Sequence, residues 1–201
     1  FGQLSMFCSQ AYGAGNLPLV GTWLQIYLVF STAAAVPLVL LRWLTAPVLR
    51  ACGVPREVAD LAGVYTVWSQ AAVLFDLWFA SVKEYYAAQN IVRPDAAVDA
   101  IFIFVNILVV YVLVFVFGWG IVGAAVATSF TRFARTVTYV LYCCRMGYHR
   151  STWHGWDWSE ILVWDRWRRL LVQTLPAALG GLAEELQFEV CTLLAARMGA
   201  V

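Results

Sequence analysis

Residues 100–131, AIFIFVNILVVYVLVFVFGWGIVGAAVATSFT, contain no charged side chain. As one straight helix these 32 residues would extend about 48 Å, whereas the hydrocarbon core of a bilayer is only about 30 Å thick. The sequence Gly118-Trp119-Gly120 supplies a turn, and its tryptophan suits the membrane interface. The stretch therefore predicts two membrane-spanning helices, over about 98–117 and 121–144.

The composition of the whole chain agrees with this prediction. Hydrophobic residues make up 62% of the 201 residues and charged residues 12%, against roughly 45–50% and 25% in soluble proteins. A soluble fold of this size cannot remove so much apolar surface from water. The net charge of +1 provides no basic field for a nucleic-acid partner. We therefore expect an all-α, polytopic membrane helix bundle in contact with lipid.

Other apolar stretches extend the bundle. Residues 1–41 also lack charge, and GAGNLP at 13–18 divides them. Because the chain begins at Phe1 and ends at Val201 inside apolar stretches, we expect a piece of a longer protein. Spans are expected over about 21–41, 62–86, 98–117, 121–144 and 169–196, with the end of one more helix near Tyr12.

One long polar stretch interrupts these spans. Residues 145–168, RMGYHRSTWHGWDWSEILVWDRWR, are rich in tryptophan and predict an interfacial segment with an amphipathic helix. Lys and Arg are more frequent in the connections at 83–95 and 145–169 than in those on the other side. The positive-inside rule therefore predicts that both connections are cytosolic.

Four motifs follow one another along the chain. The motifs are CSQAYGAGN at 8–16 with VGTWLQ at 20–25, YAAQNIVRP at 86–94, GWGIVGAAVA at 118–127, and WHGW at 153–156 with LPAAL at 175–179 and EELQFE at 184–189. In this order and spacing they resemble the motifs of the multidrug and toxic compound extrusion (MATE) family, in its eukaryotic branch. One departure stands out, because Glu185-Leu186 replaces the aromatic pair that is usual in the family.

The resemblance implies part of a bundle of twelve helices in two lobes. Residues 1–145 would form N-lobe helices, from the end of the second to the sixth. Residues 146–168 would form a cytosolic amphipathic linker, and residues 169–201 the first, truncated helix of the C-lobe. The full-length protein is expected to be a monomer in the plasma membrane or a vacuolar-type membrane.

The resemblance also implies a function. We expect a secondary active antiporter that exports small, cationic organic or xenobiotic compounds by alternating access, in exchange for protons or sodium and with no other cofactor. One alternative is a lipid-linked substrate flippase of the same superfamily, and another is a non-transporting, degenerate or scaffold membrane protein. An enzyme is not expected, because the two histidines both lie in a loop.

Three glutamates are candidates for proton coupling. Glu184 lies fifteen residues past Arg169, about 22 Å into its predicted helix, and a carboxylate at that depth suits a group that takes up and releases a proton. The resemblance assigns this role to Glu184 and Glu189. The spacing alone offers a rival pair, because Glu185 and Glu189 share one helix face. We prefer Glu184.

Two further charged residues lie deep in predicted spans. Asp76 is in the middle of its helix, where it could pair with Lys83 or line a cavity. Arg132 lies about 18 Å past Gly120, where it could hold an anionic group, pair with Asp76 or cap carbonyl groups. No metal site is expected, because the histidines lack carboxylate or cysteine partners at ligand spacing.

Overall fold

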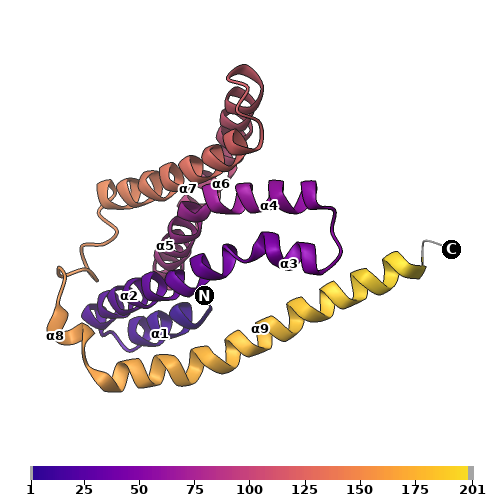
Figure 1. The fold of residues 1–201 in the computed structure, drawn as a ribbon. Coiled ribbons are helices and arrows are strands. Elements are labelled where there is room, and N and C mark those ends of the chain that lie inside the picture. Colours follow the sequence, from indigo (N-terminus) through magenta and orange to yellow (C-terminus); the bar gives the residue numbers. More distant parts are fainter. Residues whose placement is uncertain (1, 199–201) are drawn as a thin grey trace. The chain divides into compact units, whose positions relative to one another are not determined.

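The computed structural model describes residues 2–198, with the side chains of residues 2–181, 183, 184 and 187, and this part of the chain consists of helices and their connecting loops, without strands (Figure 1). The all-α prediction is confirmed. The helices are α1 Gly2–Gly13, α2 Leu17–Arg42, α3 Thr45–Ala51, α4 Arg56–Trp68, α5 Gln70–Ala87, α6 Arg93–Tyr111, the π-helical turn η1 Val112–Val116, α7 Gly120–Arg145, α8 Trp158–Ile161 and α9 Trp164–Met198.

The chain divides into two compact units, Phe1–Trp156 and Asp157–Val201. The first unit contains α1 to α7, and the second contains α8 and α9. The predicted limits of the N-lobe, linker and C-lobe stay a prediction.

Local signals in the sequence start and stop the first helices. Gly15 adopts a φ of +72°, which favours glycine and turns the chain after α1. The side chain of Asn16 then accepts a hydrogen bond from the backbone N–H of Leu19 at 3.2 Å and caps α2. Pro18 occupies the first turn of α2, where its missing N–H costs nothing. Pro37 lies inside the same helix without ending it.

The span predicted over 62–86 is not one helix. It divides at Ser69 into α4 and α5, which meet at a bend of 52°. Arg42, the last residue of α2, donates a hydrogen bond from Nη2 to the buried Ser69 Oγ at 2.7 Å. The bend is therefore tied to α2, a contact that local helix propensity cannot predict.

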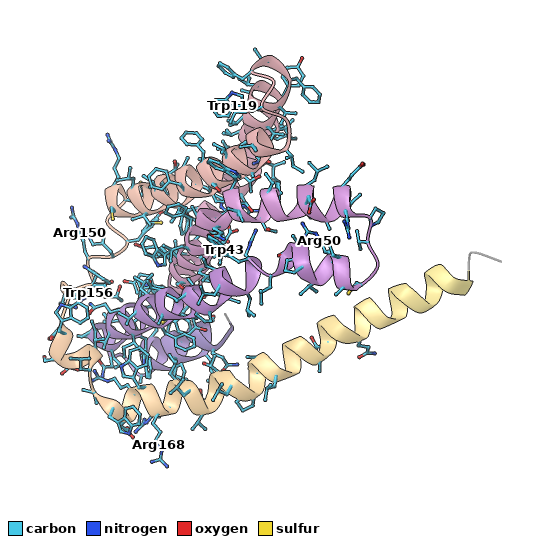
Figure 2. All side chains as sticks on the ribbon, in the orientation of Figure 1. Trp43, Arg50, Trp119, Arg150, Trp156 and Arg168 are labelled. Atoms are coloured by element: carbon cyan, nitrogen blue, oxygen red, sulfur yellow. The ribbon has the colours of Figure 1, made fainter. Side chains whose placement is uncertain are left out.

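Two helices in the described residues are long and apolar enough to cross a membrane, over Leu17–Trp43 and Arg93–Val116. The bent pair α4–α5 provides a third if it counts as one span. The spans predicted over 121–144 and 169–196 coincide with α7 and α9, which are too polar to belong to this group. Trp119, in the turn between η1 and α7, is 53% exposed (Figure 2).

The segment 147–156, which we call the strap, returns from the end of α7 to α2 and α5. Thr152 is fully buried, and its Oγ1 lies 2.5 Å from Tyr85 Oη of α5. Gln25 of α2 donates from Nε2 to the carbonyl oxygen of Gly155 at 2.6 Å. Hydrogen bonds between residues more than sixty positions apart in the sequence thus hold α2, α5 and the end of α7 together.

Gly21 allows the closest approach between the strap and α2. A Cβ atom at this position would lie 3.2 Å from the carbonyl carbon of Thr152 and closer still to its oxygen. The backbone of the strap therefore occupies the space that any side chain on residue 21 would need.

Within the second unit, side-chain contacts hold α8 against the first turn of α9. The Asp157 carboxylate accepts from the backbone N–H of Ser159 at 2.9 Å and caps α8. A hydrogen bond from the Ser159 hydroxyl lowers the pKa of this carboxyl group. Arg166 of α9 reaches back to the Glu160 carboxylate at 2.5 Å, and Trp167 Nε1 donates to the carbonyl oxygen of Ile161 at 2.7 Å.

We predict that Gly21→Ala displaces the strap and lowers the free energy of unfolding by about 1–3 kcal/mol, because the new methyl group meets backbone atoms that cannot turn away. The measurement is thermal melting of the detergent-solubilised protein. Gly13→Ala is the matched control, since a Cβ there meets nothing within 4 Å. Equal melting temperatures for the Gly21→Ala and Gly13→Ala variants would contradict the prediction.

Candidate functional site

Asp76 of α5 is the centre of a cluster of charged side chains. Its Oδ1 accepts hydrogen bonds from Arg135 Nη2 at 2.7 Å and from Arg132 Nη1 at 3.1 Å, both on α7. Two guanidinium groups thus share one carboxylate oxygen. Hydrogen bonds between ionised groups are about twice as strong as neutral ones, so Asp76 joins α5 firmly to α7.

The cluster continues onto α6. Arg135 Nη1 donates to Asp99 Oδ1 at 3.1 Å, and its guanidinium lies 3.9 Å from the centre of the Phe79 ring. Lys83 of α5 lies 3.0 Å from the Asp95 carboxylate and 4.0 Å from that of Asp99. We call the whole set, Lys83, Asp95, Asp99, Arg135, Asp76 and Arg132, the charge ladder.

The ladder extends from one end of the helices toward their middle. Lys83 lies four residues before the end of α5, about 6 Å from it. Arg132 lies thirteen residues before the end of α7, about 20 Å from it. The two ends are on the same side, because α5 and α7 run in the same direction past each other, with Phe75 against Phe133 and Phe79 against Tyr139.

The sequence predictions for the ladder were met in part. The pairing of Asp76 with Arg132, one of the alternatives, is present. Lys83, the other partner considered for Asp76, binds Asp95 instead, because its side chain faces the start of α6. Sequence reasoning missed Asp95 and Asp99, although their spacing of four residues placed both carboxylates on one helix face.

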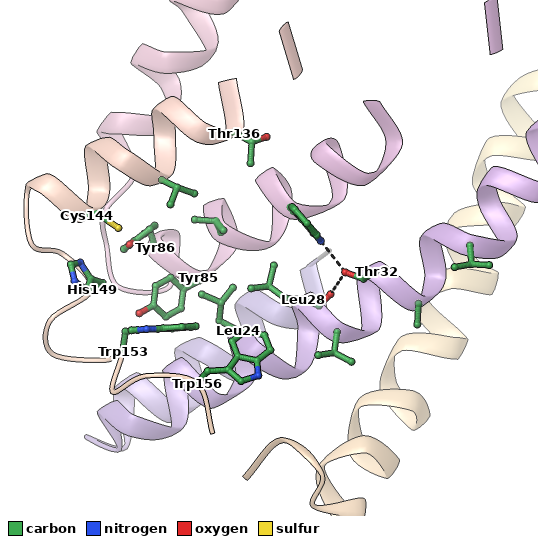
Figure 3. A pocket seen from close by; sticks show the side chains of 16 residues that line it. Leu24, Leu28, Thr32, Tyr85, Tyr86, Thr136, Cys144, His149, Trp153 and Trp156 are labelled. Carbon is green, nitrogen blue, oxygen red and sulfur yellow. Dashed lines mark hydrogen bonds between the residues drawn. The ribbon is translucent and has the colours of Figure 1, made fainter. Parts of the chain in front are cut away.

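An apolar cavity of about 970 Å³ lies between α2, α5, α7 and the strap (Figure 3). Its walls are mostly aliphatic and aromatic. Thr32 of α2 accepts a hydrogen bond from Trp78 Nε1 at 3.0 Å and donates to the carbonyl oxygen of Leu28 at 2.7 Å. The aromatic lining residues are Trp78, Tyr85, Tyr86, Trp153 and Trp156. We call this space the aromatic cavity.

The strap closes one end of the aromatic cavity. Trp153 and Trp156 have ring centres 6.1 Å apart, and Figure 3 shows both beside Leu24 of α2. His149, which we did not expect to have a role, also lines the cavity. Sequence reasoning used these tryptophans to predict an interfacial segment and to detect a resemblance, and it missed that their spacing could form an aromatic wall.

The predicted coupling glutamates all lie on α9. The side chain of Glu184 is exposed. The side chains of Glu185 and Glu189 lie outside the described residues. The roles of all three therefore stay predictions. No group of three or more His, Cys, Asp or Glu side chains that could hold a metal ion occurs among the residues whose side chains are described.

Comparison with known proteins gives matches along most of the chain. The family model described as MatE matches residues 4–112. Protein DETOXIFICATION 36 of Arabidopsis thaliana is 28% identical over 160 residues, which are 79% of this chain and 32% of that protein. Multidrug and toxin extrusion protein 1 of Xenopus tropicalis is 27% identical over 200 residues, 100% of this chain and 34% of that protein.

A solved structure has the same fold. The crystal structure of the eukaryotic MATE transporter AtDTX14 superposes with a TM-score of 0.78 at 22% sequence identity, over 84% of this chain and 38% of that one. The chain thus spans about a third of the length of the curated relatives it matches.

We predict that Asp76→Asn lowers the free energy of unfolding by about 1–3 kcal/mol, because it leaves Arg132 and Arg135 without their shared counter-charge. Thermal melting in detergent measures the change. Asp60→Asn is the matched control, since Asp60 forms an exposed pair with Arg50, which Figure 2 labels, and such pairs contribute about 0–1 kcal/mol. An Asp76 variant that melts like the control would show that the shared carboxylate is dispensable.

Proposed function

The chain belongs to the MatE family, and we propose that it is part of a secondary active antiporter that exports organic compounds by alternating access, in exchange for protons or sodium. The observation that carries the proposal is the match of the family model to residues 4–112, which include the helices that line the aromatic cavity on two sides. Several relatives bear names that refer to extrusion or detoxification. A transporter also accounts for the absence of a recognisable catalytic motif in the sequence.

We propose that the aromatic cavity contributes to binding of the substrate. Its volume of about 970 Å³ is in the range of small-molecule sites, and its walls are apolar with a few hydrogen-bonding groups. Tryptophan and tyrosine rings attract organic cations through their negative faces. The substrate class that these walls favour is a flat or bulky amphipathic organic compound, cationic or neutral.

We propose that Glu184 carries the coupling proton. Glu184 lies twenty residues after the start of α9, and a carboxylate within a long helix of a membrane transporter has few roles other than ion coupling or ion pairing. Protonation from one side and substrate binding from the other would then exclude each other. Glu185 and Glu189 form the rival pair.

We further propose that the full-length protein is a monomer in a plasma membrane or a vacuolar-type membrane.

Replacing Glu184 tests the coupling. In sealed vesicles that contain the full-length protein, we expect a pH gradient to drive uptake of a fluorescent organic cation, and we expect Glu184→Gln to reduce this uptake at least tenfold. Glu57→Gln, in the first turn of α4, is the control for loss of a carboxylate. Uptake that survives in Glu184→Gln but disappears in Glu185→Gln or Glu189→Gln would move the coupling to the rival pair. Wild-type uptake driven by neither protons nor sodium would refute the antiporter.

Replacing Trp153 tests the substrate site. We predict that Trp153→Ala raises KM for the same cation by about tenfold while kcat changes little, because it removes one aromatic wall without touching a charge. Trp43→Ala is the matched control, since Trp43 is 62% exposed at the end of α2 and does not line the cavity (Figure 2). An unchanged KM in the Trp153 variant would exclude the cavity as the binding site.

A further inference from the structure

A second hollow, of about 360 Å³, lies between α6 and α7 and shares no lining residue with the aromatic cavity. The wall from α6 combines the apolar Phe102, Ile103 and Ile107 with the polar Asp99 and Asn106. The opposite wall comes from α7 and includes Arg132. We call this space the α6–α7 groove. The groove combines apolar side chains with the charged guanidinium of Arg132, as a binding site for an amphipathic ion does.

The charge ladder beside the groove is neutral as a whole but polarised along its length. Lys83, Asp95 and Asp99 lie near the connected ends of α5 and α6 and sum to a charge of −1. Asp76, Arg132 and Arg135 lie deeper and sum to +1. A positive charge at this depth in a membrane protein is costly unless an anion lies beside it. Asp76 is that anion for both arginines, and Arg132 is the more exposed of the two cations that line the groove.

The two arginines differ in how firmly they are held. Arg135 is bound by Asp76 and Asp99 and lies over a ring, and its side chain is only 14% exposed. Arg132 has one carboxylate partner among the described residues, Asp76, and its side chain is 40% exposed. A guanidinium has five N–H donors, so Arg132 keeps several for a ligand in the groove. Arg135 instead fixes Asp76, which positions Arg132.

Neutral polar groups beside Arg132 complete the deep end. Asn106 of α6 donates from Nδ2 to Thr131 Oγ1 at 2.7 Å, and both residues line the groove. Asp99 lines the shallow end, where Arg135 at 3.1 Å and Lys83 at 4.0 Å offset its charge. With the charge of Asp99 offset in this way, Arg132 is the guanidinium that the groove offers to a ligand.

We propose that the α6–α7 groove binds an amphipathic organic anion, with its carboxylate on Arg132 and its apolar body against Phe102, Ile103 and Ile107. A guanidinium binds a carboxylate through two parallel hydrogen bonds, which an amide of the same shape cannot reproduce. The groove is thus a second ligand site of opposite charge preference, separate from the cavity proposed for organic cations.

A pair of ligands of equal shape tests the charge preference. The full-length protein in lipid nanodiscs is titrated with radiolabelled 4-phenylbutyrate, and 4-phenylbutyramide serves as the neutral competitor. We expect the acid to bind at least tenfold more tightly than the amide. Arg132→Gln should abolish this difference, and Arg132→Lys should restore part of it. Arg50→Gln, which removes an exposed arginine of α3, should change neither affinity.

Filling the groove tests its location without altering an ion pair. Ile103 is 60% exposed, so Ile103→Trp introduces bulk into the groove at little cost to packing, and thermal melting confirms that the variant is folded. We expect this variant to lose binding of the acid at least tenfold. Three results would each overturn the proposal: equal binding of acid and amide, no binding of the acid by the wild type, or undiminished binding by Ile103→Trp.

Discussion

Two guanidinium groups that share one carboxylate oxygen set the arrangement of α5, α6 and α7. Asp76 holds Arg132 and Arg135, and Arg135 extends the contact to Asp99 on α6. Charged side chains in a membrane bundle must be paired or face water, so these three helices can pack only in the rotations that bring the charges together. The aromatic cavity and the α6–α7 groove both border α7, and both depend on this rotation.

The strap provides the second constraint, at one end of the same helices. Thr152 is buried against α2 and α5, and it can reach this position only because residue 21 has no side chain. The strap therefore does more than connect two predicted lobes. Its tryptophans form a wall of the aromatic cavity, so the shape of the proposed substrate site depends on a loop and on one glycine of α2.

The two hollows differ in their chemistry. The aromatic cavity offers rings and few polar groups, which favours organic cations and neutral compounds. The groove offers a guanidinium at its deep end, which favours a carboxylate. The two hollows share α7, which contributes both Thr136 to the aromatic cavity and Arg132 to the groove.

The sequence by itself determined the helical membrane class and several of the turns between helices, because long apolar stretches and glycine-rich turns are local signals, and its ordered motifs indicated the family. It also singled out Asp76 and Arg132 as charged residues within predicted spans. Only the tertiary structure decided that α4 and α5 bend at Ser69, that Lys83 binds Asp95, and which side chains enclose the two hollows. Hydropathy locates each helix along the chain. Packing against other helices decides which way the side chains of that helix point.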